Sequence, residues 1–156
     1  MGPNPTDRGK KGVKRSALVE ADGGPLAVVI AGANVPDAKL LAQTLDAIVV
    51  ERPEPTPAQP QNLCLDKGYD NPTGHQVTED HHYQPHIRRI GEEKLAPKRR
   101  KRYPARRWVV ERTFAWLSKC RAILVRYAKL PSVYLGLIQL ACILLWFRRL
   151  YRLKEF

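Results

Sequence analysis

The chain has 156 residues, 44% of them hydrophobic, which is enough for one domain with its own core. Its 27 Lys and Arg residues outnumber 15 Asp and Glu, and the formal charge of +12 indicates a polyanionic partner such as nucleic acid. The polar first 16 residues are inconsistent with a secretory signal peptide, so we expect a cytoplasmic protein.

The N-terminal part predicts a β-hairpin followed by a helix. Apolar residues 16–20 and 25–31 flank the turn sequence Asp22-Gly23-Gly24, a pattern typical of two antiparallel strands. Residues 37–50 predict a helix, and the aspartate at position 37 is suited to cap or begin it. Residues 51–61 contain four prolines and predict an extended surface loop.

The middle of the chain predicts a second group of alternating elements. Residues 62–66 read as a buried, central strand that stops at Asp66 before a turn at Lys67-Gly68. A short polar helix is expected over residues 72–81, and a further strand over residues 83–88. Strands and helices in this order predict an α/β fold, a mixed sheet flanked by helices.

Two helices are expected to end the chain, over residues 105–127 and 132–151. The most apolar part of the second, Tyr134–Phe147, has 14 residues, whereas a membrane-spanning helix needs about 20. We therefore expect a buried core helix and no membrane contact.

Two carboxylates have positions that suit metal chemistry. Asp66 ends a predicted strand, and ligands of α/β folds bind at strand ends. Glu111 lies beside the apolar stripe Val110, Phe114, Leu117, Cys120 and Leu124 of the predicted helix. Each has a plainer interpretation: Asp66 caps a turn, and Glu111 forms a surface ion pair with Arg107. Together, such acids can hold magnesium ions against a phosphate.

The positive charge is concentrated in residues 88–107. This basic loop contains ten Lys or Arg and two acids, a local balance of +8, and immediately precedes the Glu111 helix. It would bind a phosphate backbone with strong salt dependence. The alternative is a solvated loop without a partner.

Cysteine and histidine residues indicate no resident metal of their own. Cys64, Cys120 and Cys142 are scattered in apolar segments and are expected to be buried thiols in a reducing compartment. The four histidines lie between residues 75 and 86 without paired ligand spacing, so a solvated loop is favoured over a zinc site.

Three stretches give a resemblance to a known family: Asn4–Lys10, Leu65–Asp70 and Arg106–Leu117. They are similar to the DDE-type transposases of bacterial insertion sequences, whose catalytic acids lie on a ribonuclease H-like fold. The likeness covers nearly the whole chain. It implies metal-dependent DNA strand cleavage and transfer in transposition, with Mg²⁺ or Mn²⁺ as cofactor, double-stranded DNA of the element ends and target as partner, and a homo-oligomeric active complex.

By this resemblance, Asp66 matches the second acid of the catalytic triad and Glu111 the third, both as metal ligands. The residues that the resemblance and the basic loop assign to DNA contact are Arg99, Arg100, Lys101, Arg102, Tyr103, Arg106, Arg107 and Lys119. Tyr103 lies one residue further upstream than the family pattern has it. Ser118 stands where the family has its Lys, with Lys119 directly after it.

The first acid of the triad has no counterpart. The family carries it on a strand ahead of the segment that matches Asn4–Lys10, and only three residues precede that segment here. We therefore expect residues 1–156 to form a single partial catalytic domain that lacks its first strand and has little or no activity without an upstream polypeptide. The alternatives left open are a non-catalytic DNA-binding remnant, an inhibitor of an intact transposase and a basic RNA-binding protein.

Overall fold

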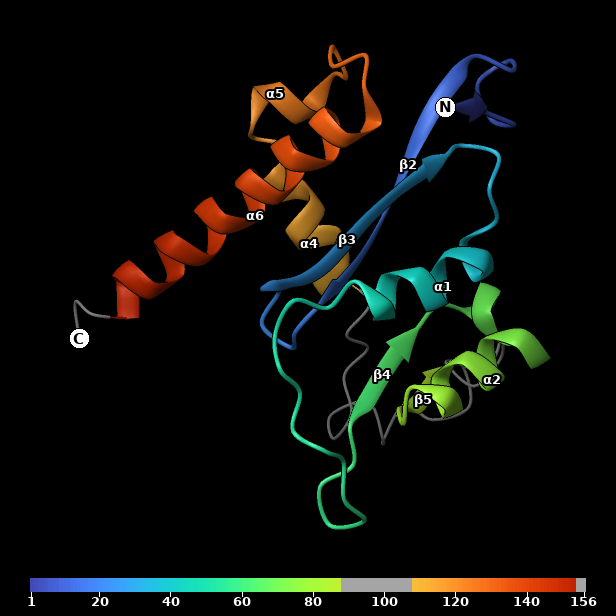
Figure 1. Cartoon of the computed structure of the whole chain (residues 1–156), viewed down its shortest axis with the longest axis vertical. Coiled ribbons are helices and arrows are strands. Elements are labelled where there is room, and N and C mark those ends of the chain that lie inside the picture. The colour runs from blue at the N-terminus through green and yellow to red at the C-terminus, as the bar shows by residue number, and fades with distance from the viewer. Residues whose placement is uncertain (88–107, 154–156) are drawn as a thin grey trace, which may run out of the picture.

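The computed structural model describes residues 1–87 and 108–153 (Figure 1). Within these residues the elements are, in chain order, β1 Gly2–Pro3, β2 Lys11–Val19, β3 Pro25–Gly32, α1 Asp37–Asp46, β4 Asn62–Leu65, the 3₁₀ helix η1 Lys67–Tyr69, α2 Pro72–Asp80, β5 Gln84–Ile87, α4 Trp108–Leu117, α5 Arg121–Leu124 and α6 Pro131–Leu153.

The predicted hairpin is present, and its strands are longer than the sequence pattern indicated. β2 and β3 pair antiparallel from Val13 opposite Gly32 to Val19 opposite Pro25, with an irregularity after Leu18. Two backbone hydrogen bonds between Glu20 and the two glycines that follow close the turn. β2 and β3 are the longest strands in the described part of the chain, and helices pack against both faces of the hairpin (Figure 1).

The turn of the hairpin needs both glycines. Gly23 has φ +89°, a left-handed conformation that side chains with a Cβ rarely adopt. A Cβ on Gly24 would come within 2.4 Å of the Trp146 ring of α6, so a larger residue there would force this ring to move. Trp146 Nε1 also donates a hydrogen bond of 2.8 Å to the Pro25 carbonyl oxygen. The turn is thereby fixed against the C-terminal helix.

Helices cover both faces of the hairpin, and successive residues of β2 point alternately to one face and the other. Ala17 packs against a core cluster that includes Val28, Leu117, Ile123 and Ile138, between the hairpin and α4, α5 and α6. Leu18 packs against the second cluster, formed by Leu41, Leu45 and Leu63 of α1 and β4. This alternation follows from the two-residue period of a strand and gives a mixed α/β arrangement.

β4 and β5 form a separate, parallel pair joined by α2. The register places Asn62 opposite Gln84 and Leu65 opposite Ile87. The strand, helix and strand predicted here are confirmed, with β4 ending at Leu65, one residue before Asp66. The central position predicted for β4 is not observed, because in the described part of the chain it pairs with β5 alone.

Two predicted helices end earlier than the apolar pattern indicated. α1 stops at Asp46. Beyond it the Val49 N–H bonds the Leu26 carbonyl oxygen of β3 at 3.5 Å, and not a carbonyl of its own helix. The single helix predicted over 105–127 is wrong beyond Leu117. There the Cys120 N–H bonds the Leu117 carbonyl oxygen, three residues back, which tightens and ends the helix before α5.

α6 is only half a core helix. Tyr134, Ile138 and Ala141 are buried, whereas other large apolar residues of the helix are exposed, namely Val133, Leu140, Ile143, Leu144, Phe147, Leu150 and Tyr151. The prediction of a buried helix is therefore correct for one face only. Residues 131–152 are long and apolar enough to span a membrane by length and composition, a property that single helices of water-soluble proteins share.

The predicted burial of the cysteines is wrong for one of the three. Cys64 is exposed, while Cys120 and Cys142 are partly buried. Burial raises the pKa of the Cys142 thiol to about 11, and so keeps it protonated at neutral pH. Cys64 lines an open cavity, and its neighbour Leu63, on the other face of β4, is buried.

His81 links α2 to α1 and should make stability depend on pH. Its Nε2 lies 2.9 Å from Asp46 Oδ1, and this hydrogen bond raises the pKa of His81. A histidine with a raised folded-state pKa stabilises fully below its unfolded value of about 6.5, and this contribution is lost as pH rises through the folded value. The free energy of unfolding should thus fall modestly, by about 1 kcal/mol or less, between pH of about 6 and about 8.

Chemical denaturation of the unmodified chain and of Asp46→Asn across this range measures the effect. Asp46→Asn should flatten the pH profile. Glu79→Gln, which removes an exposed acid from the last turns of α2, should leave it unchanged. Equal pH profiles for the chain and Asp46→Asn would contradict the assignment.

Candidate active site

Asp66 lies directly after β4, where its carboxylate caps the short helix η1. Its Oδ1 accepts a hydrogen bond of 2.8 Å from the Lys67 N–H. The side chain is exposed. The capping role weighed from sequence is thus present.

Tyr69 connects Asp66 with α1 and was given no role by sequence reasoning. Burial raises the pKa of this half-buried phenol, and the negative charges of Asp37 and Asp66 raise it further. Asp37, the first residue of α1, is also 3.1 Å from Lys14 Nζ. The Tyr69 phenol therefore remains protonated and lies within electrostatic reach of both acids.

Glu111 lies in the first turn of α4 and is exposed. The buried residues of α4 are Val109, Thr113 and Leu117, which recur every four residues and face the hairpin. Of the stripe predicted from sequence, Leu117 belongs to the core cluster and Phe114 and Cys120 pack against it, whereas Leu124 is 60% exposed. Glu111 lies two residues from both Val109 and Thr113, so it occupies the other side of the helix.

The hairpin turn fixes the position of α4 and so of Glu111. Arg112 Nη2 donates a hydrogen bond of 2.7 Å to the Asp22 carbonyl oxygen, and its guanidinium lies over the rings of Trp108 and Trp116, at 4.5 and 4.8 Å. Thr113 Oγ1 donates to the Gly23 carbonyl oxygen at 2.8 Å. These contacts hold the helix at both its exposed and its buried side.

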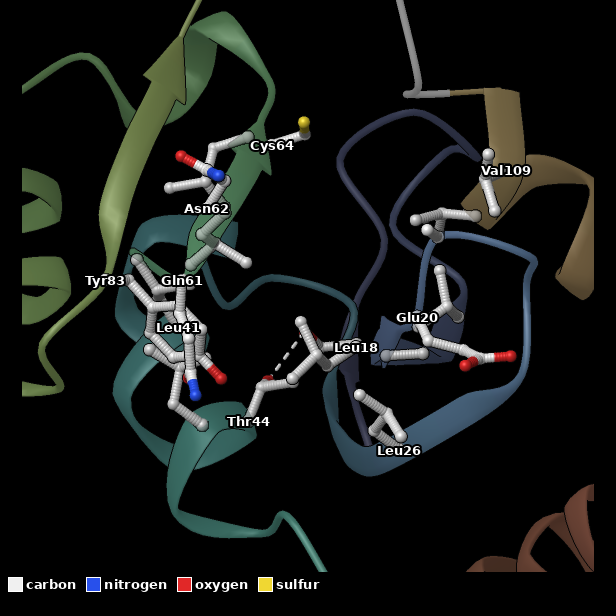
Figure 2. Close-up of a pocket in the computed structure, with 18 of the residues that line it drawn as sticks. Leu18, Glu20, Leu26, Leu41, Thr44, Gln61, Asn62, Cys64, Tyr83 and Val109 are labelled. Carbon is white, nitrogen blue, oxygen red and sulfur yellow. Dashed lines mark hydrogen bonds between the residues drawn. The ribbon is translucent and has the colours of Figure 1, made fainter. Parts of the chain in front are cut away.

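An open cavity of about 390 Å³ lies between the elements that carry the two acids. Leu65 and Val110 line it, and these residues directly precede Asp66 and Glu111. Figure 2 shows Val109 of α4 on one side of this space and Cys64 of β4 on the other. Across residues 1–87 and 108–153, no three His, Cys, Asp or Glu side chains form a group able to hold a metal.

Most residues predicted to contact DNA lie outside the described part of the chain, namely Arg99, Arg100, Lys101, Arg102, Tyr103, Arg106 and Arg107. The predicted ion pair of Arg107 with Glu111 is therefore also outside the description, because Arg107 is one of these residues. Lys119 is exposed in the turn after α4, eight residues beyond Glu111. The six residues from Glu111 to Leu117 alone span roughly 9 Å of helix, so Lys119 follows the end of α4 that is opposite to the Glu111 end.

Comparison with known proteins decides the family. Residues 2–146 match the family model described as the transposase DDE domain. The chain belongs to this transposase family. It is 34% identical over 160 residues to a protein of Burkholderia cepacia named, provisionally, as a transposase for insertion sequence element IS402. This match covers 99% of the chain and 72% of the relative. No solved structure matches the chain significantly.

The transposase match confirms the resemblance found in the sequence and includes both candidate acids. Residues 2–146 extend from β1 into α6, so the hairpin, the β4–β5 pair and α4 all belong to the matched domain. The ribonuclease H-like arrangement and the roles of Asp66 and Glu111 remain predictions.

Proposed function

We propose that this transposase chain is the C-terminal part of an enzyme that cleaves DNA strands at element ends and transfers them to a target. The carrying observation is that Asp66 and Glu111, both exposed, follow directly on residues that line one cavity. β4 and α4 thus both border this space, and in each case an acid is the next residue along the chain. The phosphodiester would approach from the solvent side, where both acids are exposed.

The two acids suit Mg²⁺ or Mn²⁺. Magnesium prefers oxygen ligands and is commonly held by one or two carboxylates together with substrate phosphates. Asp66 and Glu111 supply such oxygens, and the cap at Lys67 fixes the Asp66 carboxylate through its Oδ1. A metal bound there would neutralise charge developing on the scissile phosphate and activate the attacking hydroxyl.

The surrounding residues support positioning. Arg112 and Thr113 hold α4 against the hairpin and so fix Glu111 relative to the sheet. Tyr69, protonated at neutral pH, lies within electrostatic reach of the Asp66 carboxylate. The basic loop of residues 88–107 would bind the DNA backbone, with Tyr103, Arg106 and Arg107 close in sequence to Glu111 and Lys119 beyond α4.

A complete metal site needs a further acid in this proposal. Asp37 is engaged by Lys14, and the described residues contain no three-ligand group. We infer that an upstream segment supplies the third carboxylate. Subunits of a homo-oligomer would then act on the two element ends in the bacterial cytoplasm.

A strand-cleavage and strand-transfer assay with Mg²⁺ or Mn²⁺ tests the proposal. The substrate is DNA of the neighbouring element ends, and the chain alone is compared with the chain joined to its upstream-encoded segment. Cleavage by the joined protein and not by the chain alone is expected. No cleavage by either form, with DNA binding intact, would contradict the catalytic role.

The second candidate function is a DNA-binding remnant or inhibitor of an intact transposase. The absence of a three-ligand group in the described residues favours it. Both functions require DNA affinity that falls steeply with salt, about tenfold or more between roughly 50 and 200 mM. Only the remnant would inhibit an intact transposase without ever cutting DNA itself.

A further inference from the structure

Trp108, the first residue of α4, is an exposed aromatic side chain next to a candidate catalytic acid. It is 51% exposed, although Trp side chains are on average well buried. Glu111 follows three residues later, so the two side chains are neighbours on the helix surface, with Cβ atoms roughly 5–6 Å apart. The Trp108 ring therefore borders the place where a scissile phosphate would be bound.

A stack of side chains along α4 holds the Trp108 ring in place. The Arg112 guanidinium lies over the Trp108 ring at 4.5 Å and over the Trp116 ring at 4.8 Å. The three residues are spaced by four, which places Arg112 between the two rings along one side of the helix. Cation–π contacts of this kind contribute roughly 0.5–2 kcal/mol each, and the larger values apply where the cation is desolvated.

The hairpin turn fixes this stack from the other side. Arg112 Nη2 donates a hydrogen bond of 2.7 Å to the Asp22 carbonyl oxygen. A Cβ on Gly23 would come within 3.2 Å of Arg112 Nη2 and 3.3 Å of the Trp116 ring, so the turn packs closely on both. Arg112 Nε is buried without a hydrogen-bond partner among the described residues, so this part of the guanidinium is desolvated. A ring held in this way loses little conformational entropy when it binds a ligand.

An exposed, fixed indole ring beside a phosphate site suits a nucleobase. Every base has an apolar π-face, and stacking of a base on an aromatic side chain contributes roughly 1–3 kcal/mol. One sugar joins a base to its phosphate, so a phosphate at Glu111 leaves the base within reach of a side chain one helical turn away. A base inside a duplex is already stacked on both sides, so the ligand must be an unpaired base.

The charge of the C-terminal part of the chain favours a nucleic acid strand over an apolar or cationic partner. Residues 112–153 contain no Asp or Glu. They contain eight basic residues, namely Arg112, Lys119, Arg121, Arg126, Lys129, Arg148, Arg149 and Arg152. A ligand that stacks on Trp108 and also carries phosphates is therefore complementary to α4 and to the segments that follow it.

We propose that the exposed face of Trp108 stacks on an unpaired nucleobase of the DNA strand whose phosphate lies at Glu111. Arg112 is a positioning residue, which acts through the Trp108 ring and does not itself touch the base. The inference rests on the proposed function, because that function brings the DNA strand next to Glu111. It adds a contact that depends on the base, and salt weakens such a contact much less than it weakens a phosphate contact.

Two single-stranded DNA probes separate base stacking from phosphate contact. One is a twelve-residue thymidine oligonucleotide, and the other is an abasic oligonucleotide with the same sugar-phosphate backbone and length. The affinity of the full chain for each is measured by fluorescence anisotropy in a metal chelator. Trp108→Leu keeps an apolar side chain without a ring, and Trp108→Phe keeps a ring. Tyr127→Leu is the matched control, because it removes an aromatic ring that is 82% exposed and lies beyond α5.

The unmodified chain should bind the thymidine probe about tenfold more tightly than the abasic probe. Trp108→Leu should lose most of this ratio, whereas Trp108→Phe and Tyr127→Leu should keep it. The thymidine probe should also quench the tryptophan fluorescence of the unmodified chain and not that of Trp108→Phe, since Trp116 and Trp146 are less exposed. The quenching measurement remains decisive if Trp108→Leu fails to fold.

Equal affinity of the unmodified chain for both probes, or an undiminished ratio in Trp108→Leu, would overturn the proposal. An equal loss in Tyr127→Leu would also overturn it, because the base contact would then not be specific to Trp108. Neither metal nor cleavage is needed, so inactivity in the strand-transfer assay leaves the inference standing. Failure to bind either probe would overturn both the inference and the DNA-binding part of the proposed function.

Discussion

Asp66→Asn and Glu111→Gln should each reduce DNA cleavage by the joined transposase by roughly 10²-fold to 10³-fold or more, with little change in DNA affinity. Each substitution keeps the size of the side chain and removes the negative charge that a hard cation requires. Both side chains are exposed, so neither change removes core packing. Cleavage rates under saturating Mg²⁺ and DNA binding in a metal chelator measure the two effects separately.

The matched controls are Glu54→Gln and Glu79→Gln, which remove exposed acids that neither line the cavity nor adjoin a lining residue. They should cleave at the unmodified rate. Loss of cleavage in the controls would mean that net charge, and not metal binding, limits activity. Full cleavage by Asp66→Asn or Glu111→Gln would rule out the metal-ligand role of that residue.

Ile138→Ala should lower the free energy of unfolding by about 2–5 kcal/mol, whereas Leu140→Ala on the same helix should change it by roughly 0.5 kcal/mol or less. Ile138 is 0% exposed and belongs to the core cluster between the hairpin and the C-terminal helices. Leu140 is 53% exposed. Both changes shorten an aliphatic side chain in α6. Alanine is the better helix former in each case, and slightly more so against β-branched Ile, so helix propensity opposes the expected difference and packing must account for it.

Urea denaturation followed by circular dichroism measures both variants. Similar losses for Ile138→Ala and Leu140→Ala would mean that the outer face of α6 is covered in solution. The pair therefore also tests whether the exposed apolar face is open to solvent in the free chain.

Local sequence signals predicted the elements whose determinants are local. The hairpin was predicted from Asp22-Gly23-Gly24 between apolar segments, and α2 was predicted from a polar stretch that begins at Pro72. The end of α1 and the break after Leu117 were missed, because the backbone there bonds to residues outside the helical pattern or tightens its last turn. Apolar periodicity continues through both points and carries no sign of this.

The candidate acids were found by residue type and resemblance, while their surroundings were not predictable. Arg112 and Thr113 contact the hairpin turn 90 residues away in sequence. The proximity of Tyr69 to both Asp37 and Asp66 depends on the packing of η1 against α1. The exposure of Cys64 has the same origin, since it depends on what packs against that face of β4 and not on the apolar character of the strand.

The contacts of Trp146 and Arg149 with the hairpin turn have a consequence for how the chain folds. Arg149 Nη1 donates a 2.7 Å hydrogen bond to Glu20 Oε1, 129 residues earlier, and Trp146 reaches Pro25 across 121 residues. Contacts this distant in sequence require closure of a very long loop and slow the folding rate. During synthesis the hairpin is made more than 100 residues before Trp146 and Arg149, so the sheet face that α6 covers stays exposed until those residues have been added.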